Sequence, residues 1–368
     1  SAQSIERFWP CCFLTVRQEF AMLDDAILET LLCKIPSLRV GVIGDLFLDR
    51  YLEIDHALTE PSIETGLDAY QVVKVRSIPG AAGTVINNLV ALGVAAVHAV
   101  AVIGDDGEGY ELRQALKQLG VVDDTGVFAW EGRRTPTYTK PMLHDRGKLP
   151  RELNRLDIKN RSPLAPQAQE EIFHRLEKIW PEVDALLVLD QVSEPECGVI
   201  AGSVRERLTQ LGEAQPDRLI LADSRERVHL FQGMTVKPNQ RECLRAVGSL
   251  ETGDLDEAIR ELANRTKRPV FCTCGEQGIV LIDPRGGGTG INQVPGYPVQ
   301  GPIDVVGAGD STSAAIACAL ATGASLQTAA AFGNLVASIT IQQIGTTGTA
   351  SPEQIRGRWR EIQGSHAG

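Results

Sequence analysis

The sequence has 368 residues, 43% of them hydrophobic and 23% charged, which suits a globular chain with one large α/β domain and an accessory piece. The formal net charge of −11 at pH 7 argues against nucleic-acid binding, because phosphate backbones attract a basic face. No apolar run reaches the length of a membrane span, and the run at residues 9–16 is too short for a signal-peptide core. We therefore expect a soluble, cytoplasmic protein that binds neither nucleic acid nor a membrane.

The eight cysteines do not form a recognisable metal or redox pattern. Most of them lie in apolar stretches, and the sequence holds no Cys-x-x-Cys and no paired histidines. We expect buried, reduced thiols that behave as small hydrophobic side chains.

Residues 1–37 are expected to form an N-terminal extension ahead of the main domain. Within it, residues 21–34 carry a helix-like apolar pattern that ends near Pro36. The extension could pack on the main domain or on a partner chain. The main domain is expected to span residues 38–355, with a C-terminal tail at 356–368.

The first strong element of the main domain is a buried strand at residues 39–50. It runs into two acids, Asp45 and Asp49. In α/β proteins the carboxyl ends of parallel strands bind ligands, and carboxylates there can accept hydrogen bonds from sugar hydroxyls. Locally, a turn with two solvated acids explains the pattern about as well.

Two β-rich segments, at about 51–78 and 127–158, interrupt an alternation of strands and helices. Between them lie a small-residue turn, Pro79-Gly-Ala-Ala-Gly-Thr84, a helix through about residue 92, a strand at 94–103 and a helix at 107–119. The two segments could pair into a small sheet that covers a cleft, as a lid does.

From residue 157 onward the alternation is regular. Helices are expected at 165–179 and 196–211, and after residue 242. Strands are expected at 185–189, 218–222, 234–237 and 270–273, followed by a hairpin of 279–282 and 291–294. This order predicts a mostly parallel sheet with helices on both faces.

The stretch Gly301-Pro-Ile-Asp-Val-Val-Gly-Ala-Gly-Asp310 precedes an Ala-rich helix. A helix start offers unpaired N–H groups and the positive end of the helix dipole, so small residues there suit an anion. An acid beside an anion site makes sense as a base that takes a proton from an attacking hydroxyl. Taken alone, the stretch is better explained as a glycine turn with Asp310 as helix N-cap.

The sequence contains neither a P-loop nor a His-Arg-Asp kinase loop. Over residues 38–355 it resembles instead the ribokinase-like (PfkB) carbohydrate kinases. Four stretches carry the resemblance in order: Pro79-Gly-Ala-Ala-Gly83, Pro238-Asn-Gln-Arg-Glu242, Thr273-Cys-Gly-Glu-Gln-Gly278 and Asp304-Val-Val-Gly-Ala-Gly-Asp310. The resemblance implies a three-layer αβα ribokinase-like fold with a mostly parallel central sheet and a small β-sheet lid.

Within that family the chain is similar to the kinase half of the heptose-7-phosphate kinase/ADP-heptose synthases. Gly44-Asp-Leu-Phe-Leu-Asp-Arg-Tyr51, Leu153-Asn-Arg-Leu-Asp157 and Ile344-Gly-Thr-Thr-Gly348 carry this likeness. The His-x-Gly-His motif of the adenylyltransferase half does not occur in the sequence, so only the kinase activity is implied.

The sequence departs from the family pattern mainly on the expected sugar side. Ala81 replaces the second glycine of the N-terminal signature, and Thr84 stands where an Asn is usual. Gln191-Val-Ser-Glu194 replaces a Tyr-x-Lys-Gly type of segment, and Val305 replaces a Thr. These changes leave the substrate open and weaken the case for a monovalent cation such as K⁺.

The resemblance implies a role for each matching residue. Asp310 is the general base, and the N–H groups of Gly307, Ala308 and Gly309 hold the transferred phosphoryl group. ATP and Mg²⁺ are the expected cofactors, with metal contacts from Asn239, Glu242 and Asp304. The nucleotide is expected at Asn239, Thr273, Gly275, Gly278 and Asn334. The substrate is expected at Asp45, Asp49, Gly80, Ala81, Thr84, Arg134 and Lys140.

The leading interpretation is an ATP-dependent kinase of a sugar or sugar phosphate. A catalytically idle sensor of sugar or nucleotide and a nucleoside kinase on the same scaffold are the alternatives. A homodimer through the lid sheets is expected by analogy with the family.

Overall fold

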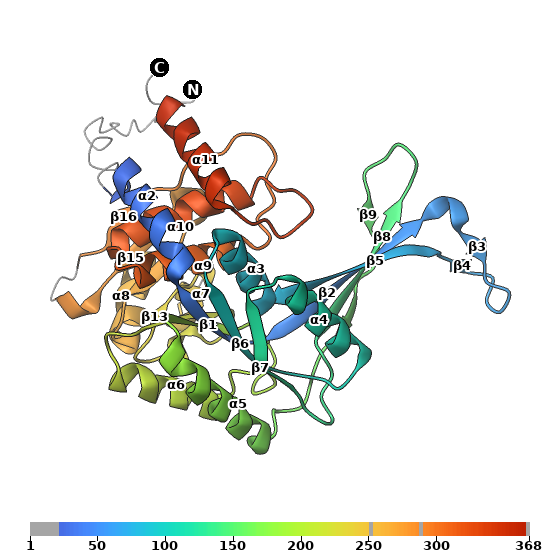
Figure 1. Ribbon diagram of the computed structural model, residues 1–368, viewed down its shortest axis with the longest axis horizontal. Coiled ribbons are helices and arrows are strands. Elements are labelled where there is room, and N and C mark those ends of the chain that lie inside the picture. Colours follow the sequence, from blue (N-terminus) through green and yellow to red (C-terminus); the bar gives the residue numbers. More distant parts are fainter. Residues whose placement is uncertain (1–21, 250–252, 287–289, 366–368) are drawn as a thin grey trace, which may run out of the picture.

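The computed structural model describes residues 22–249, 253–286 and 290–365. Its main domain is built on a nine-stranded sheet in the order β16-β15-β14-β13-β12-β11-β1-β6-β7 (Figure 1). All neighbouring strands from β14 to β7 run parallel, and β15 and β16 are antiparallel at one edge. The strands are β1 Arg39–Gly44, β6 Ala96–Ile103, β7 Val122–Ala129, β11 Ala185–Asp190, β12 Leu219–Ser224, β13 Thr235–Val236, β14 Val270–Thr273, β15 Ile279–Ile282 and β16 Asn292–Val294.

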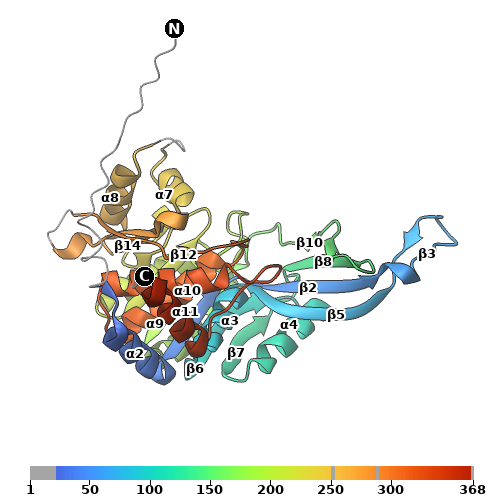
Figure 2. The same ribbon diagram turned by 90° about the horizontal axis from the view of Figure 1, so that it is seen from above.

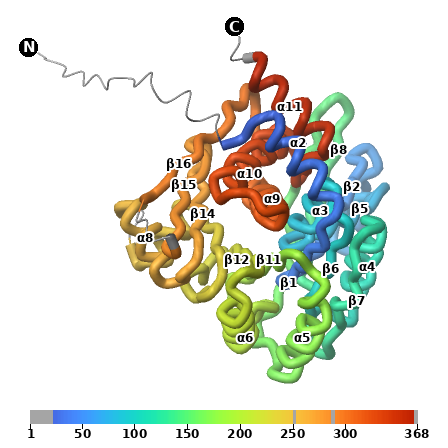
Figure 3. Tube along the Cα trace, turned by 60° about the vertical axis from the view of Figure 1, so that its left-hand side comes forward, coloured from blue at the N-terminus to red at the C-terminus, as the bar shows by residue number. Residues whose placement is uncertain are grey.

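Helices cover both faces of this sheet. One face is packed by α3, α9 and α10, and the other by α5, α6 and α8 (Figures 1 and 3). The helices are α2 Asp25–Lys34, α3 Ala82–Leu92, α4 Gly107–Gln118, α5 Pro166–Ile179, α6 Gly202–Ala214, α7 Gln240–Ala246, α8 Leu255–Thr266, α9 Ala308–Ala321, α10 Leu326–Thr340 and α11 Pro352–Ser365. The expected three-layer fold is confirmed, and α8 is a helix that the sequence reading did not identify.

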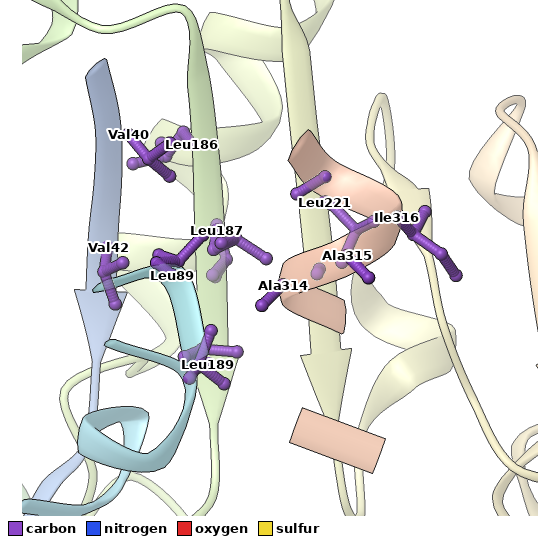
Figure 4. Close-up of a cluster of buried hydrophobic side chains, with 14 of the residues drawn as sticks. Val40, Val42, Leu89, Leu186, Leu187, Leu189, Leu221, Ala314, Ala315 and Ile316 are labelled. Atoms are coloured by element: carbon purple, nitrogen blue, oxygen red, sulfur yellow. The ribbon is translucent and has the colours of Figure 1, made fainter. Parts of the chain in front are cut away.

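The core lies between the central strands and the helices. All six residues of β11 are buried, as expected for a parallel strand with helices on both sides. Figure 4 shows Leu187 and Leu189 of β11 beside Val42 of β1 and Leu89 of α3. In α9 the small side chains from Ala314 to Ala319 are buried, which lets this helix pack closely on the sheet and on α10.

A second sheet projects from the main domain (Figure 2). Its strands follow the order β10-β8-β2-β5, with β9 paired to β8, and a separate pair joins β3 and β4. They are β2 Leu46–Asp55, β3 Glu60–Pro61, β4 Asp68–Ala69, β5 Val72–Ala81, β8 Thr137–His144, β9 Arg151–Glu152 and β10 Leu156–Ile158. The two β-rich segments do pair with each other, but residues 127–129 belong to β7 of the main sheet.

The strand expected at residues 39–50 is divided between the two sheets. β1 ends at Gly44 and β2 begins at Leu46, so Asp45 lies at the crossing point. A Cβ atom at Gly44 would lie 2.3 Å from the carbonyl oxygen of Leu189, and only glycine fits this close approach. The hydrophobic pattern alone did not distinguish one long strand from two.

Both ends of the described chain are attached to the main domain. Leu28, Leu31 and Leu32 of α2 are buried in the core. Arg356 of α11 forms an ion pair with Glu29, and Trp359 Nε1 donates to Asp25 Oδ1 at 2.6 Å. The described part of the extension, from residue 22, therefore packs on its own domain, and the tail expected from residue 356 continues a helix. The expected helix at 196–211 begins only at Gly202.

Of the expected thiols, those at 197, 243, 272, 274 and 318 are buried and free, and Cys33 is exposed. Cys11 and Cys12 lie outside the described residues, as do residues 287–289 between the two strands of the expected hairpin. Among the described residues, no cluster of three or more His, Cys, Asp or Glu side chains has the geometry of a metal site. Within the same ranges, no helix is both long and apolar enough to cross a membrane.

Candidate functional site

The Gly301–Asp310 stretch forms a tight turn at the start of α9. Gly307 is the N-cap residue with φ 81°, a left-handed conformation that favours glycine, and the helix begins at Ala308. Asp310 is the third residue of the helix, and its side chain makes no capping hydrogen bond. The interpretation of Asp310 as an N-cap is therefore wrong.

The first N–H groups of α9 are not all available to a ligand. The N–H of Ala308 donates to the carbonyl of Val305 at 3.2 Å, so it turns into the loop. Within the described residues, the N–H groups of Gly309 and Asp310 have no acceptor. The N–H of Gly307 likewise has no acceptor there, so the expected donors Gly307 and Gly309 are open, Ala308 is not, and Asp310 is an additional open donor.

Asp304 fixes the shape of this turn. Its Oδ1 accepts from the N–H of Val306 at 3.0 Å, and its Oδ2 accepts from the N–H of Gly345 at 3.1 Å. Its own N–H donates to the carbonyl of Ile341 at 2.7 Å. These bonds join the turn to the loop after α10, which is a positioning role and not the metal contact expected from the sequence.

The Asp310 carboxyl lies among other charged groups at the carboxyl ends of the strands. Although it is only half-buried, the surrounding protein removes much of its hydration, and this burial together with Asp223 raises its pKa to about 7. Lys237 and Arg225 oppose that rise, and Asp49 adds to it. A carboxylate with a pKa near neutrality is suited to general-base chemistry.

Lys237 is a buried cation that the sequence reading missed. Its Nζ forms an ion pair with Asp223 Oδ2 at 3.1 Å, and the same oxygen accepts from Ser313 Oγ of α9 at 2.8 Å. A Cβ atom at Gly309 would lie 3.6 Å from this Nζ, so the ammonium group lies against the glycine turn. One feature of the sequence could have identified Lys237: it directly follows the buried strand β13.

Arg225 is the second cation that the sequence reading missed. It follows β12 directly, two residues after Asp223, and its N–H donates to the carbonyl of Asp190 at 3.2 Å. Its exposed guanidinium has no carboxylate partner among the described residues, yet it lowers the pKa of both Asp310 and Glu242.

The Asn-x-x-Glu motif forms a capping box at the start of α7. Asn239 Oδ1 accepts from the N–H of Glu242 at 2.9 Å, and Glu242 Oε2 accepts from the N–H of Asn239 at 2.8 Å. Burial and the charge of Asp223 raise the pKa of Glu242, although Lys237 opposes the shift. Although burial lowers it, the charges of Asp223, Glu242 and Asp310 raise the pKa of Lys237.

The residues expected to contact a nucleotide fall into two groups. Gly278 (φ 87°) and Asn334 hold a loop: a Cβ atom at Gly278 would lie 2.2 Å from the carbonyl oxygen of Val294, and Asn334 Nδ2 donates to that oxygen at 3.0 Å. Thr273 forms an isolated parallel β-bridge with Asn239, and a Cβ atom at Gly275 (φ 58°) would point into open space. Only the second group leaves room for a ligand.

On the other side of the site, Asp49 lies on β2 and Lys140 on β8. Lys140 Nζ contacts Asp49 Oδ2 at 3.1 Å and the hydroxyl of Tyr51 at 3.2 Å. A Cβ atom at Gly80 would lie 2.9 Å from Cγ of Asp49, so glycine is needed beside this carboxylate. The predicted residues Asp49, Gly80 and Lys140 are thus brought together.

Ala81 and Thr84 lie at the start of α3, which packs against α9. Ala81 is the N-cap residue with φ 53° and ψ −115°, a conformation that costs a non-glycine residue about 1–3 kcal/mol. Thr84 is buried, and a Cβ atom at Gly307 would lie 3.6 Å from its Cγ2. Thr84 therefore borders the glycine turn of α9.

Two residues expected at the substrate are engaged elsewhere. The buried carboxylate of Asp45 accepts from the N–H groups of Gln191, Val192 and Val199, at 2.8, 3.1 and 2.6 Å, so it shapes the loop after β11. Burial and, next, the charge of Asp190 raise its pKa to about 6. Arg134 is exposed and pairs with Asp106 and Glu108, which makes it a surface charge.

Comparisons with known proteins bear on the family and the fold. Residues 197–354 match the pfkB family carbohydrate kinase description. The bifunctional protein HldE of Trichlorobacter lovleyi is 28% identical over 90% of the chain, and that of Rhodospirillum rubrum is 30% identical over 87%. The chain spans 65% and 62% of the length of these relatives.

Solved structures share the fold. Arabidopsis thaliana ribokinase, complexed with ribose and ATP, is 17% identical with a TM-score of 0.62 and covers 88% of this chain and 98% of its own. Escherichia coli phosphofructokinase-2, in complex with potassium, is 21% identical with a TM-score of 0.63 and covers 89% of this chain and 99% of its own. The resemblance found in the sequence is confirmed: residues 197–354 match the pfkB carbohydrate kinase family, the HldE proteins resemble most of the chain, and the fold is ribokinase-like.

Proposed function

We propose that the protein transfers the terminal phosphoryl group of ATP to a hydroxyl of a sugar-like acceptor. The observation that carries this proposal is the Asp310 carboxyl, whose pKa is raised to about 7 at the start of α9, next to the open N–H groups of Gly309 and Asp310. A base and an anion site in contact are what phosphoryl transfer to an alcohol needs.

In this mechanism Asp310 takes the proton of the attacking hydroxyl. The hydroxyl oxygen forms a bond to the terminal phosphorus, the bond from that phosphorus to the bridging oxygen breaks, and ADP leaves. The N–H groups of Gly309 and Asp310 and the side chain of Lys237 face the charge that develops. We call Asp223, Arg225, Lys237, Glu242 and Asp310 the donor side.

Mg²⁺ would neutralise charge on the ATP phosphates when bound. Asn239 and Glu242 would hold it through water, because their capping box fixes both side chains at the edge of the site. By contrast, Asp304 and Val305 do not fit a monovalent-cation site. Asp304 directs both carboxylate oxygens to backbone N–H groups, and Val305 brings no hydroxyl.

Arg225 would bind the phosphates of ATP. Its guanidinium has no carboxylate partner among the described residues and acts electrostatically on both Asp310 and Glu242. A planar guanidinium is a good partner for phosphate because it donates in a fork geometry.

The test is ATP consumption, at saturating Mg²⁺, against a panel of sugars, sugar phosphates and nucleosides. We expect turnover of at least one sugar or sugar phosphate and its loss in Asp310→Asn. Turnover of nucleosides alone would make the protein a nucleoside kinase. Tight ligand binding without turnover of any panel member would make it a sensor.

We also propose a cytoplasmic homodimer, cytoplasmic because the reaction draws on ATP. Val75 and Leu156 are 46% and 62% exposed on one face of the projecting second sheet. Val75 is the Cα partner of Leu52, and Leu156 is level, through Thr139, with Arg50 two residues away. A second copy covering this face would bury them. Val75→Lys should convert a dimer to monomers in light scattering, and a wild-type monomer at high concentration would contradict the dimer.

A further inference from the structure

A small pocket lies against β2 and β8, the strands that carry Asp49 and Lys140. Phe47 and Asp49 are two residues apart in β2 and therefore point to the same face, and Tyr138 of β8 is the Cα partner of Asp49. The loop after β11 forms the opposite wall. The pocket is lined by Phe47, Pro136, Tyr138, Lys159, Asn160, Gln191, Val192, Ser193 and Glu194.

The cations at this pocket are already neutralised. Lys159 is its one lining cation among the described residues, and its Nζ pairs with Glu194 Oε1 at 3.6 Å. Next to the pocket, Lys140 pairs with Asp49 at 3.1 Å. Arg227, whose guanidinium donates to the carbonyl of Ser193, pairs with the buried Asp190 at 2.6 Å. We call Asp49, Lys140, Lys159 and Glu194 the acceptor side, and their formal charges sum to zero.

The remaining lining groups are neutral and suit hydroxyls and C–H faces. The rings of Phe47 and Tyr138 meet edge to face with centroids 5.2 Å apart, and Asn160, Gln191 and Ser193 carry uncharged polar side chains. The cavity has a volume of about 20 Å³. One water molecule needs about 10–15 Å³ on the same scale, so the cavity has room for a hydroxyl.

We propose that the acceptor is an unphosphorylated sugar or polyol, whose far end lies in this pocket as a neutral hydroxyl-bearing group. The inference rests on the proposed kinase function and names its substrate class. A phosphate at the far end would have to break the Lys159–Glu194 pair and lie beside the carboxylates of Glu194 and Asp49. Removing a charge from water without a partner is strongly unfavourable, so the paired charges of this pocket disfavour a phosphorylated acceptor.

Matched pairs of acceptors test the proposal: ribose against ribose 5-phosphate and fructose against fructose 6-phosphate. We expect kcat/KM for the neutral member of a pair to exceed that of its phosphate at least about a hundredfold. Equal or higher kcat/KM for the sugar phosphate would overturn the proposal. Turnover of either member upholds the kinase function, so the two proposals can fail separately.

A binding measurement covers the case in which neither member is turned over. Without turnover the kinase function falls, and the shift in Tm caused by each sugar still decides the acceptor class. Stabilisation by neutral sugars and not by their phosphates supports the neutral pocket. Stabilisation by the phosphates, or by neither member of any pair, overturns it.

The variant Glu194→Gln tests the charge argument directly. It leaves Lys159 without its carboxylate, so kcat/KM for a sugar phosphate should rise at least about tenfold relative to its neutral partner. The control Glu177→Gln breaks an exposed pair with Arg207 between α5 and α6, away from the pocket, and should leave the ratio unchanged. If Glu194→Gln changed kcat/KM by the same factor for the neutral sugar and for its phosphate, the proposal would be overturned.

Discussion

The donor side and the acceptor side of the candidate site differ in how their charges are matched. On the donor side three carboxyl groups surround Lys237, the pKa of Asp310 is raised to about 7, and Arg225 has no carboxylate partner in the described part of the chain. On the acceptor side each of the cations pairs with a carboxylate. The first arrangement is completed by an anion and a metal ion, whereas the second is already balanced and suits a neutral ligand.

The largest expected effect comes from removing the base on the donor side. Asp310→Asn keeps the size of the side chain and cannot accept the proton, so kcat should fall about 10²–10⁴-fold. Steady-state kinetics and ATP binding by calorimetry check this, with binding expected to stay within about threefold. The exposed Asp217→Asn is the matched control, and normal turnover by Asp310→Asn would rule out the base assignment.

The pH profile should report the same carboxyl. Because Asp310 acts as a base only when ionised, kcat/KM should fall about tenfold for each pH unit below about 7 and level off above it. The folded state holds this proton more tightly than the unfolded chain, so the contribution of Asp310 to stability decreases as pH rises from about 4 to about 7. An activity profile that is flat down to pH 5 would contradict the raised pKa.

Replacing Arg225 should weaken the interaction with ATP on the donor side and leave the acceptor side unaffected. Arg225→Gln should lower kcat/KM for ATP about tenfold, which corresponds to about 1.4 kcal/mol, because the phosphates lose a charged partner. Tm should not change, since the side chain is exposed and breaks no ion pair within the described residues. Arg207→Gln, on the surface of α6, is the control and should leave kcat/KM for ATP unaltered. An equal decrease of kcat/KM in this control would show that Arg225 has no specific role in binding ATP.

The smallest effect is expected at the strained turn bordering the acceptor side. Ala81 has φ 53°, and Ala81→Gly should stabilise the protein by about 1 kcal/mol, because the strain relieved exceeds the entropy that glycine adds to the unfolded chain. Urea unfolding measures this. Ala26→Gly, on the exposed face of α2, should show the opposite sign, with a loss of about 0.5–1 kcal/mol. Destabilisation by Ala81→Gly would show that the turn is not strained.

Motifs of small residues were the part of this protein that could be predicted from the sequence. The small residues of the 301–310 stretch indicated the start of α9, although Gly307 and not Asp310 is its N-cap. The helix after residues 238–242 was also expected, whereas the capping box of Asn239 and Glu242 was not. The alternation of apolar strands and helices likewise fixed the parallel sheet, because each element must bury one face.

Only the tertiary structure decided which charges meet. Asp223, Arg225 and Lys237 carry no motif, and they reach Asp310 because parallel strands end at the same edge of the sheet. Asp45 and Asp49 look equivalent in the sequence, four residues apart, yet one bonds to backbone N–H groups and the other to Lys140. The chain passes from one sheet to the other at Asp45, so the sheet that receives each residue determines its partners.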